Sequence, residues 1–356
     1  EVYDGPHATP KKTVDGPVYL GIDAITDDGK INAKEFAHLS EEDYIKWTKR
    51  VTPQYGDIVF SYEATLGRYA LIPKDFYGCL GRRLAVIRNV SKDIDTLWLY
   101  YYFLSPEWKQ FIQSKIIKGS TVNRISVEDF PTYTVPNISI KVQRKIANIL
   151  SKIDEKIALN NNINDNLEQQ MHLIFENMMA KAATHKLSGE YTIAQNLATV
   201  VTGKEDANFS VPNGKYKFFT CSNTPLLCDE YVFDSSSILI AGNGDFNVKH
   251  YSGKFNAYQR TYILTPDKKY FGLLYLASLY RINSFKSRSS GSIVKFITKS
   301  DVENIPVFIP NDMFYLQELN KLIYLQEQNK LENELLVNLR DWLLPMLMNG
   351  QATISD

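Results

Sequence analysis

The sequence predicts a mixed α and β protein in which two similar globular domains are separated by two long helices that pair as an antiparallel coiled coil. Two observations predict this fold class. Two stretches carry apolar residues at the alternating three-four spacing of a coiled coil, and the rest of the chain repeats itself at offsets of 172 to 177 residues. The expected segments are residues 1–138 (first domain), 139–185 (first long helix), 186–311 (second domain) and 312–356 (second long helix).

The first long helix is predicted from an apolar seam within residues 139–180. A helix of about 40 residues is about 60 Å long, which is more than a globular core needs, so it requires a partner helix. The two interleaved seven-residue series are Ile146, Ile153, Asn160, Leu167 and Ile174, and Leu150, Ile157, Asn164, Met171 and Met178.

The partner is predicted within residues 312–344. Its two series are Leu322, Asn329, Leu336 and Leu343, and Leu325, Glu332, Leu339 and Met346. Both helices carry polar residues at mid-seam, and in an antiparallel pair these polar layers would meet. Because a buried Asn layer fixes the register of a coiled coil, we expect Asn160, Asn164, Asn329 and Glu332 to set it. Two unrelated surface helices remain the alternative.

The elements of the first copy follow from local signals. Residues 18–22, 56–61, 69–72 and 84–88 are predicted strands because they are short apolar runs between turn formers. Residues 40–47 are a predicted helix capped by Ser40, and residues 95–105 and 106–116 are a predicted helical pair with Pro106 in a first turn. Residues 62–67 form a loop that ends at Arg68. The result is a mixed sheet with peripheral helices.

The second copy repeats this scaffold with different loops. Residues 119–129 match residues 291–301, and Arg83 matches Arg260. Residues 216–220 and 237–241 are the predicted strands, and the loop 242–247 replaces the loop 62–67. Residues 191–203 have no counterpart before Glu1, so we expect the first copy to lack its opening segment or to borrow it. A repeated scaffold with different loops is typical of two copies that recognise different targets. Sequence drift after duplication also makes loops differ, however.

Charge and cysteine content narrow the class of protein. The 356 residues carry 40 basic and 40 acidic side chains, but residues 186–300 hold 14 basic and 8 acidic ones, whereas residues 301–356 hold 3 and 9. Positive charge is therefore placed locally. Three cysteines without zinc-ligand spacing indicate a reducing compartment. No apolar run reaches transmembrane length, and the first residues do not have the pattern of a signal peptide, so we expect a cytoplasmic protein that does not contact a membrane.

No motif for catalysis is present. The sequence contains no phosphate-binding loop, no dinucleotide fingerprint and no Asn/Asp-Pro-Pro-aromatic methyltransferase motif, and its five histidines are dispersed. We therefore expect no catalytic residue, no metal site and no cofactor in this chain.

Basic and polar residues on loops instead favour DNA binding. Arg and Asn can contact base edges bidentately, while Lys and Ser suit phosphates. About half of these residues are expected to be ordinary surface residues. The candidate DNA-binding residues are Lys11, Lys12, Tyr62, Arg68, Arg82, Arg83, Lys118, Ser120, Asn123, Arg124, Lys215, Lys217, Asn243, Asn247, Lys249, Arg260, Lys286, Arg288, Ser292 and Lys295.

The whole chain resembles the specificity subunit of type I restriction-modification systems. The resemblance is carried by the order of domains and helices and by Asp-Gly-Pro-His-Ala-Thr-Pro at residues 4–10, Gly-Asp-Ile-Val-Phe-Ser at residues 56–61 and Leu-Leu-Pro-Met-Leu-Met-Asn-Gly at residues 343–350. One departure from the repeat is Phe296, which stands where the first copy has Arg124.

The resemblance implies a non-catalytic, DNA-binding subunit. Each globular domain would be a target-recognition domain for one half of a bipartite, asymmetric site in double-stranded DNA, and the coiled coil would set the spacer. Two methyltransferase subunits would carry S-adenosylmethionine, and restriction subunits would use ATP and Mg. The apolar Ile149, Ile163 and Phe175 lie outside the seam, so we expect them to dock a methyltransferase subunit. The alternative is a coiled-coil scaffold that does not bind DNA.

Overall fold

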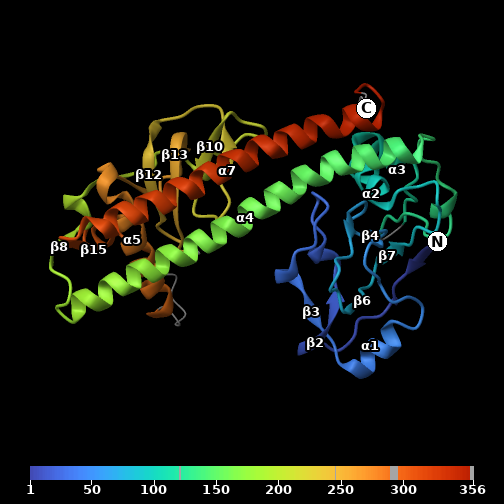
Figure 1. The fold of residues 1–356 in the computed structure, drawn as a ribbon, viewed down its shortest axis with the longest axis horizontal. Helices are drawn as coiled ribbons and strands as arrows, with labels where there is room; N and C mark the ends of the chain where they lie inside the picture. Colours follow the sequence, from blue (N-terminus) through green and yellow to red (C-terminus); the bar gives the residue numbers. More distant parts are fainter. Residues whose placement is uncertain (120–121, 245, 289–295, 353–356) are drawn as a thin grey trace. The chain divides into compact units, whose positions relative to one another are not determined.

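The structure is a computed structural model that describes residues 1–119, 122–244, 246–288 and 296–352. It divides into two compact units. Unit 1 comprises Glu1–Ile157 with Glu334–Asp356, and unit 2 comprises Ala158–Asn333. Two long helices, α4 (Ile140–Ala183) and α7 (Met313–Met348), contribute to both units (Figure 1). The prediction of a mixed α and β fold with two long helices is confirmed.

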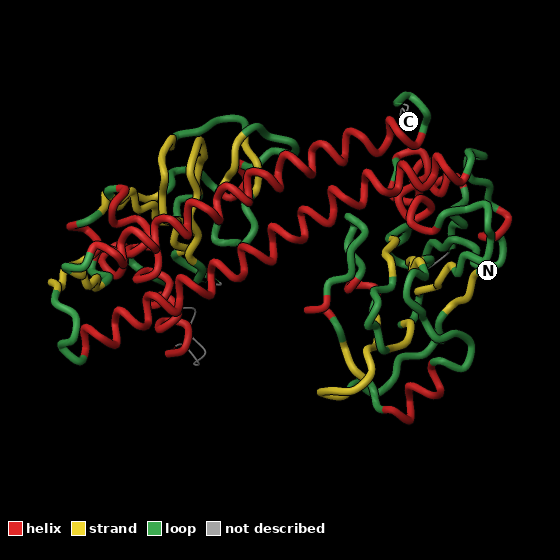
Figure 2. Tube along the Cα trace, in the orientation of Figure 1, coloured by secondary structure: helices red, strands yellow, loops and turns green. Residues whose placement is uncertain are grey.

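Unit 1 is built on a four-stranded sheet in which every neighbouring pair of strands is antiparallel. Its central strands are continuous apolar runs that are buried on both faces, which explains their place in the middle of the sheet. A second sheet has three strands (Figure 2). In spatial order the strands are β1 (Val2–Asp4), β7 (Leu84–Ile87), β4 (Ile58–Ser61) and β5 (Tyr69–Leu71), and then β3 (Ala37–His38), β2 (Thr13–Leu20) and β6 (Gly78–Leu80).

The helices of unit 1 begin where the sequence predicts. Ser40 caps α1 (Glu41–Trp47), Asp95 caps α2 (Thr96–Leu104), and Pro106 opens α3 (Pro106–Ser114). The core between α2, α3 and the sheet is aromatic, and within it Trp108 Nε1 donates a hydrogen bond of 2.8 Å to the hydroxyl of Tyr69. The four tryptophans of the chain all belong to unit 1: Trp47, Trp98, Trp108 and Trp342.

Unit 2 contains a larger version of the same sheet. The helix α5 (Phe271–Arg288) packs against it, and α6 (Lys299–Glu303) begins with a capping box at Thr298. A separate pair of strands joins β8 (Gly189–Ile193) to β15 (Pro306–Pro310). The six strands, in spatial order, are β11 (Leu226–Cys228), β10 (Tyr216–Phe219), β13 (Val248–Ala257), β12 (Phe233–Ala241), β14 (Thr261–Pro266) and β9 (Ala198–Thr202).

The two copies share a set of backbone hydrogen bonds that join the ends of their strands. The equivalent bonds have nearly the same lengths, so the repeat seen in the sequence is also a repeat of the fold. They are Gly5 N to Leu84 O (2.8 Å) and Gly203 N to Thr261 O (3.0 Å), Tyr62 N to Arg83 O (3.1 Å) and Gly242 N to Arg260 O (2.8 Å), Ile125 N to Tyr62 O (2.8 Å) and Ile297 N to Gly242 O (2.8 Å), and Ser61 N to Arg68 O (3.0 Å) and Ala241 N to Asn247 O (2.9 Å).

This equivalence corrects one expectation about the first copy. Val2 of β1 lies opposite Ile87, just as Val200 of β9 lies opposite Leu264. The strand β1 is therefore the counterpart of β9, and the idea that residues 191–203 as a whole have no counterpart is wrong. The positions equivalent to β8 and to the short helix Ala194–Asn196 fall before Glu1.

The two long helices pair antiparallel in unit 2. Asn329 Nδ2 donates to Asn164 Oδ1 (2.9 Å), and Asn160 Nδ2 donates to Glu332 Oε2 (2.7 Å). Lys181 Nζ, further along α4, reaches the hydroxyl of a residue earlier in α7, Tyr315 (3.2 Å). The polar side chains of the two helices thus contact one another in mid-seam. Their role in fixing the register remains a proposal.

One of the two predicted series on α7 is wrong by one residue. Leu325 and Leu339 are 40% and 44% exposed, whereas Gln326 is 5% exposed and its amide faces the backbone of Asn164. In a three-four pattern, the seam residue after Leu322 can lie three or four residues further along. The prediction took the shorter step because it reaches a leucine, Leu325. With the longer step, Gln326 and Asn333 contact asparagines of α4 in unit 2, and Arg340 contacts Asp154 in unit 1. The register of α7 therefore follows its hydrogen bonds to α4.

The three apolar residues expected outside the seam differ in burial. Ile163 is 38% exposed and Ile149 is half-buried. Phe175 is only 6% exposed because its ring packs on Tyr280 of α5, with the ring centroids 4.9 Å apart. The expectation that Phe175 docks another subunit is therefore wrong, since the residue belongs to the core of unit 2.

Candidate nucleic-acid interface

One end of the main sheet in each unit gathers most of the candidate residues. In unit 1 the strands alternate in direction, so the ends of β1 and β4 and the starts of β5 and β7 lie together. We call this end the loop edge. It comprises residues 5–7, 62–68, 81–83, 118–119 and 122–125 in unit 1, and residues 203–206, 220–224, 242–244, 246–247, 258–260 and 296–297 in unit 2.

In unit 1 the loop edge is closed by a short hairpin. Ile117 N donates to Arg124 O (2.9 Å), and Arg124 N donates back to Ile117 O (3.1 Å). Ile125 follows directly, is only 1% exposed, and anchors the hairpin to the end of β4 through Tyr62 O. The strands therefore hold the described part of residues 118–123 beside the turn at Arg83.

Four of the candidate side chains at this edge are exposed. Arg82 lies in the turn before β7, and Lys118, Asn123 and Arg124 lie on the hairpin. Guanidinium and amide groups can bond base edges in pairs, while an ammonium suits a phosphate. This group has the residue types that an interface with DNA needs.

Three other candidate residues make contacts within the protein. Arg83 Nε lies 3.3 Å from Glu63 Oε2, and Arg68 Nε donates to Asp27 Oδ1 (2.7 Å). Tyr62 is 6% exposed, and burial, followed by the negative charges of Asp4 and Glu63, raises its pKa to about 12. The expectation that Tyr62 contacts DNA is corrected, because its ring is part of the core.

In unit 2 the same edge carries Arg260 and Asn243. Arg260 is exposed in the turn before β14, and Asn243 is half-buried in the loop after β12. The turn and the loop are joined by the bond from Gly242 N to Arg260 O. Asn243 and Arg260 thus occupy neighbouring positions, as Glu63 and Arg83 do in unit 1.

Asn247 and Lys249 are engaged with a neighbouring loop. Asn247 Nδ2 donates to Cys221 O (2.8 Å), and Lys249 Nζ donates to Thr220 O (3.2 Å) and to Ser222 O. Burial lowers the pKa of Lys249, with Cys221 acting in the opposite sense. Direct DNA contact by either residue stays a prediction, and in the structure these donors bond backbone carbonyls of the protein.

The remaining candidates do not join these groups. Lys11 and Lys12 precede the amino end of β2, and Lys215 and Lys217 lie at the amino end of β10, whereas the carboxyl ends of both strands meet the loop edge. Ser120, Ser292 and Lys295 lie outside the described residues, and the same holds for the side chains of Lys286 and Arg288.

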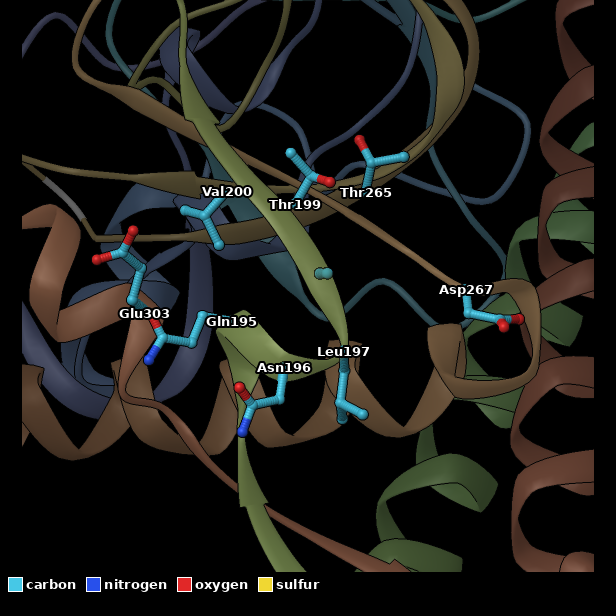
Figure 3. A pocket seen from close by; sticks show the side chains of 9 residues that line it. Gln195, Asn196, Leu197, Thr199, Val200, Thr265, Asp267 and Glu303 are labelled. Atoms are coloured by element: carbon cyan, nitrogen blue, oxygen red, sulfur yellow. The ribbon is translucent and has the colours of Figure 1, made fainter.

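A shallow pocket of about 520 Å³ lies at the opposite end of the unit 2 sheet (Figure 3). It is lined by Asn196, Thr199, Thr265 and Glu303 among others, from the start of β9 and the end of β14. It is therefore separate from the loop edge of its own unit. Among the described residues no group of three or more His, Cys, Asp or Glu side chains could hold a metal ion, and no described helix is long and apolar enough to span a membrane.

The sequence reasoning missed two parts of the loop edge. Residues 220–224 follow β10 and expose Ser222, Asn223 and Thr224, and Gln259 lies beside Arg260 with its amide on Asp206 (2.8 Å). The signal for the first was a run of short polar residues directly after an apolar strand. This loop carries no positive charge, so charge alone does not reveal it.

Comparisons with known proteins indicate the family of the chain. The family model described as "Type I restriction modification DNA specificity domain" matches residues 18–169 and 197–337. The type I restriction enzyme EcoDI specificity subunit of Escherichia coli is 35% identical over 164 residues, which are 44% of this chain and 37% of that protein. The chain thus aligns with less than half of the length of this curated relative.

A solved structure supports the fold. The crystal structure of a type I restriction-modification system S subunit from M. genitalium matches 97% of this chain and 94% of its own, with a TM-score of 0.56 and 17% identity. At that identity the likeness concerns the architecture alone.

Proposed function

The chain belongs to the family of type I restriction modification DNA specificity domains, and we propose on this basis that each unit reads one half of a bipartite, asymmetric site in double-stranded DNA through its loop edge. One observation carries the proposal. The two units build their loop edges on the same backbone hydrogen bonds but present different side chains there. One scaffold with two sets of exposed groups is what a two-part site requires.

The exposed groups suggest a division of labour. Arg82 and Arg124 in unit 1 and Arg260 in unit 2 have the planar guanidinium that pairs with guanine in the major groove. Lys118 is suited to a phosphate, which positions a protein on DNA without reading its sequence. Asn123 and Asn243 carry amides that can pair with adenine.

The chemistry belongs to partner subunits in this proposal. Two methyltransferase subunits with S-adenosylmethionine would modify adenine, and restriction subunits with ATP and Mg would cleave DNA. This chain would recognise the DNA sequence and would supply no catalytic group. The paired helices would set the spacer between the half-sites. Matched seven-residue insertions in α4 and α7 should change the spacer without changing either half-site.

The surface for a methyltransferase subunit is better placed on α7 than at Phe175. In unit 1, Leu335, Leu339 and Trp342 are 70%, 44% and 57% exposed. Their spacing of four and three places them on one face of the helix, and exposed apolar faces of this kind mark contacts with other proteins. Leu335→Glu with Trp342→Glu should abolish co-purification with a methyltransferase subunit and leave the fold unchanged. Val14→Glu, at a residue 98% exposed on β2, is the matched control.

DNA binding separates this function from the alternative of a scaffold. The full chain would be incubated with a library of duplexes in which two stretches are randomised, and the bound molecules would be sequenced. We expect two short preferred sequences separated by a spacer without preference, and an affinity that falls steeply with rising salt. A chain that retains no duplex at low salt would support the scaffold and overturn the reader.

A further inference from the structure

We propose that Asn247 and Arg68 are positioning residues, each of which holds a specificity-determining loop in place; the loop belongs to the loop edge in unit 2 and adjoins the loop edge in unit 1. The loops are residues 220–224 in unit 2 and residues 26–30 in unit 1, and Lys249 assists Asn247. The inference rests on the proposed function, because it assigns specificity within the interface proposed there. It goes further by naming loops that carry few of the charged groups expected to bind DNA.

The two residues occupy the same place in the two copies. Ser61 N donates to Arg68 O (3.0 Å) just before β5, and Ala241 N donates to Asn247 O (2.9 Å) just before β13. In unit 2 this place lies beside the loop that directly follows β10. In unit 1 it lies beside the turn at residues 26–30, which follows β2 after the short helix Ile22–Ala24. Unlike side chains have therefore been kept in one structural position, where each bonds the segment beside it.

In unit 2 the hold on the loop is nearly continuous. Asn247 binds the carbonyl of Cys221, and Lys249 binds those of Thr220 and Ser222, so three successive carbonyls are fixed. Asn247 and Lys249 are two residues apart at the start of β13, so their side chains leave the strand on the same face. The thiol of Cys221 adds a contact of 3.6 Å to Arg260 O, which ties the loop to the turn before β14.

The loop is also braced within itself. Ser222 N donates to Thr220 Oγ1 (3.2 Å), and Thr224 N donates to Ser222 Oγ (3.3 Å). A loop held in one conformation loses less entropy on binding and rejects a wrong base more sharply than a loose one. Its exposed Ser222, Asn223 and Thr224 are short polar residues of the types that contact base edges, and an Asn amide can pair with adenine.

In unit 1 an ion pair performs the same task. Arg68 Nε donates to Asp27 Oδ1 (2.7 Å), and the turn that carries Asp27 is closed by Thr26 N to Lys30 O (2.9 Å). The hydroxyl of Tyr100 donates to Gly29 O (2.9 Å) and holds the far side of the turn. The chemistry of the tether differs between the copies, and so does the segment that it holds. The equivalent bonds from Gly81 N to Leu20 O and from Tyr258 N to Phe219 O match residues 220–224 with residues 21–25, so the turn at residues 26–30 lies just beyond that match.

A positioning role and a direct DNA contact predict different measurements. A lysine that binds a phosphate contributes to affinity on every sequence and to the salt dependence, so its loss lowers both. A lysine or asparagine that positions a reading loop contributes to discrimination between bases. Its loss should leave the salt dependence as it was.

The test uses the full chain and the library of duplexes with two randomised stretches. Asn247→Ala and Lys249→Met should lower the preference for the selected bases by about tenfold in one half-site only, and Arg68→Met should do so in the other half-site only. Lys249→Arg, which keeps the donors, should restore much of the preference. Lys254→Met is the matched control, since Lys254 is exposed on the same strand and lies 4.7 Å from the ring of Tyr231.

Equal loss on all duplexes with a shallower salt dependence would overturn the proposal and make Lys249 a phosphate contact. Unchanged preferences in folded variants would overturn it as well. If Lys249→Met does not fold, Asn223→Ala, at an exposed side chain, tests the same loop and should broaden the same half-site. A wild-type chain that selects no sequence would instead overturn the proposed function.

Discussion

The loop edges of the two units have the same backbone and different side chains. Tyr62 of unit 1 and Gly242 of unit 2 accept and donate equivalent backbone hydrogen bonds, although one carries a buried ring and the other carries no side chain. Arg68 and Asn247 also share their backbone bond but differ in charge. Backbone groups are the same in every residue apart from proline, so these anchors place little demand on the sequence.

The difference teaches how such an edge can change its chemistry without losing its shape. The positions that are restricted are those where space is limited. A Cβ at Gly203 would lie 2.2 Å from Ala257 O, and Ile125 and Ile297 are 1% and 4% exposed. Between these fixed points, exposed residues are free to vary. Equivalent substitutions at an anchor that the two units share should therefore lower the stability of each unit by a similar amount. A substitution at a residue that only one unit possesses should change that unit alone.

The largest effect is expected at the shared apolar anchors. Ile125→Ala and Ile297→Ala should each lower the free energy of unfolding by about 3 kcal/mol, because each leaves a cavity beneath the loop edge. Urea unfolding of the two variants measures this, with Ile45→Ala, at a residue 65% exposed, as control. A loss at one anchor that far exceeds the loss at the other would break the equivalence of the two copies.

A smaller effect of opposite sign is expected at Tyr62, which only unit 1 possesses. Its buried hydroxyl has no hydrogen-bond partner among the described residues. Tyr62→Phe removes an unsatisfied polar atom and keeps the ring, so it should raise the free energy of unfolding by about 1 kcal/mol. The same urea titration measures the change. Destabilisation would reveal a polar contact of the hydroxyl.

Acid should distinguish the units by a still smaller amount. In unit 2, Glu327 accepts hydrogen bonds from His250 (3.0 Å) and Ser252 (3.1 Å), whereas Leu71 of unit 1 holds the place of His250. Burial alone would raise the pKa of Glu327, but the hydrogen bond and charge of His250, with Ser252, hold it below the usual 4.5. A carboxyl whose pKa is lowered on folding stabilises the protein above its usual pKa, and this stabilisation is lost as the pH falls through the lowered value.

The stabilisation of unit 2 by Glu327 should therefore be lost below a pH of about 4.5. Urea titrations of the wild type and of Glu327→Gln at a series of pH values measure this. The variant should be the less stable protein at neutral pH and should lose its disadvantage in acid. Parallel pH profiles would show that the carboxylate contributes nothing.

The smallest effect concerns binding rather than folding. Lys118→Ala should weaken binding similarly on all duplexes and make the salt dependence shallower by about one unit, as expected for one lost phosphate contact. Binding titrations at several salt concentrations give the slope. An unchanged slope would place Lys118 among ordinary surface residues.

Local signals in the sequence predicted most elements of the fold. Ser40, Asp95 and Pro106 mark helix starts because capping and a first-turn proline depend on a few neighbouring residues. The register of α7 was predicted incorrectly, because choosing between Leu325 and Gln326 needed knowledge of the polar partner on α4. A single helix does not contain that information.

The candidate site was harder to predict for a related reason. The sequence gives residue types, so Arg82, Lys118, Arg124 and Arg260 were found, and these are exposed at a loop edge. Whether a donor is free depends on groups that are distant in sequence, as with Lys249 and the carbonyl of Thr220. Phe175 was misjudged in the same way, because its partner Tyr280 is more than one hundred residues away.

The placement of the tryptophans has a spectroscopic consequence. Unit 1 holds all four tryptophans, and the strong ultraviolet fluorophore of unit 2 is tyrosine. Indole emission excited at the red edge of the absorption band therefore reports on unit 1, while far-ultraviolet circular dichroism reports on both units. Recording the two signals during one titration separates Ile125→Ala from Ile297→Ala without labels: the first should shift the emission transition, and the second should shift only the remaining dichroism.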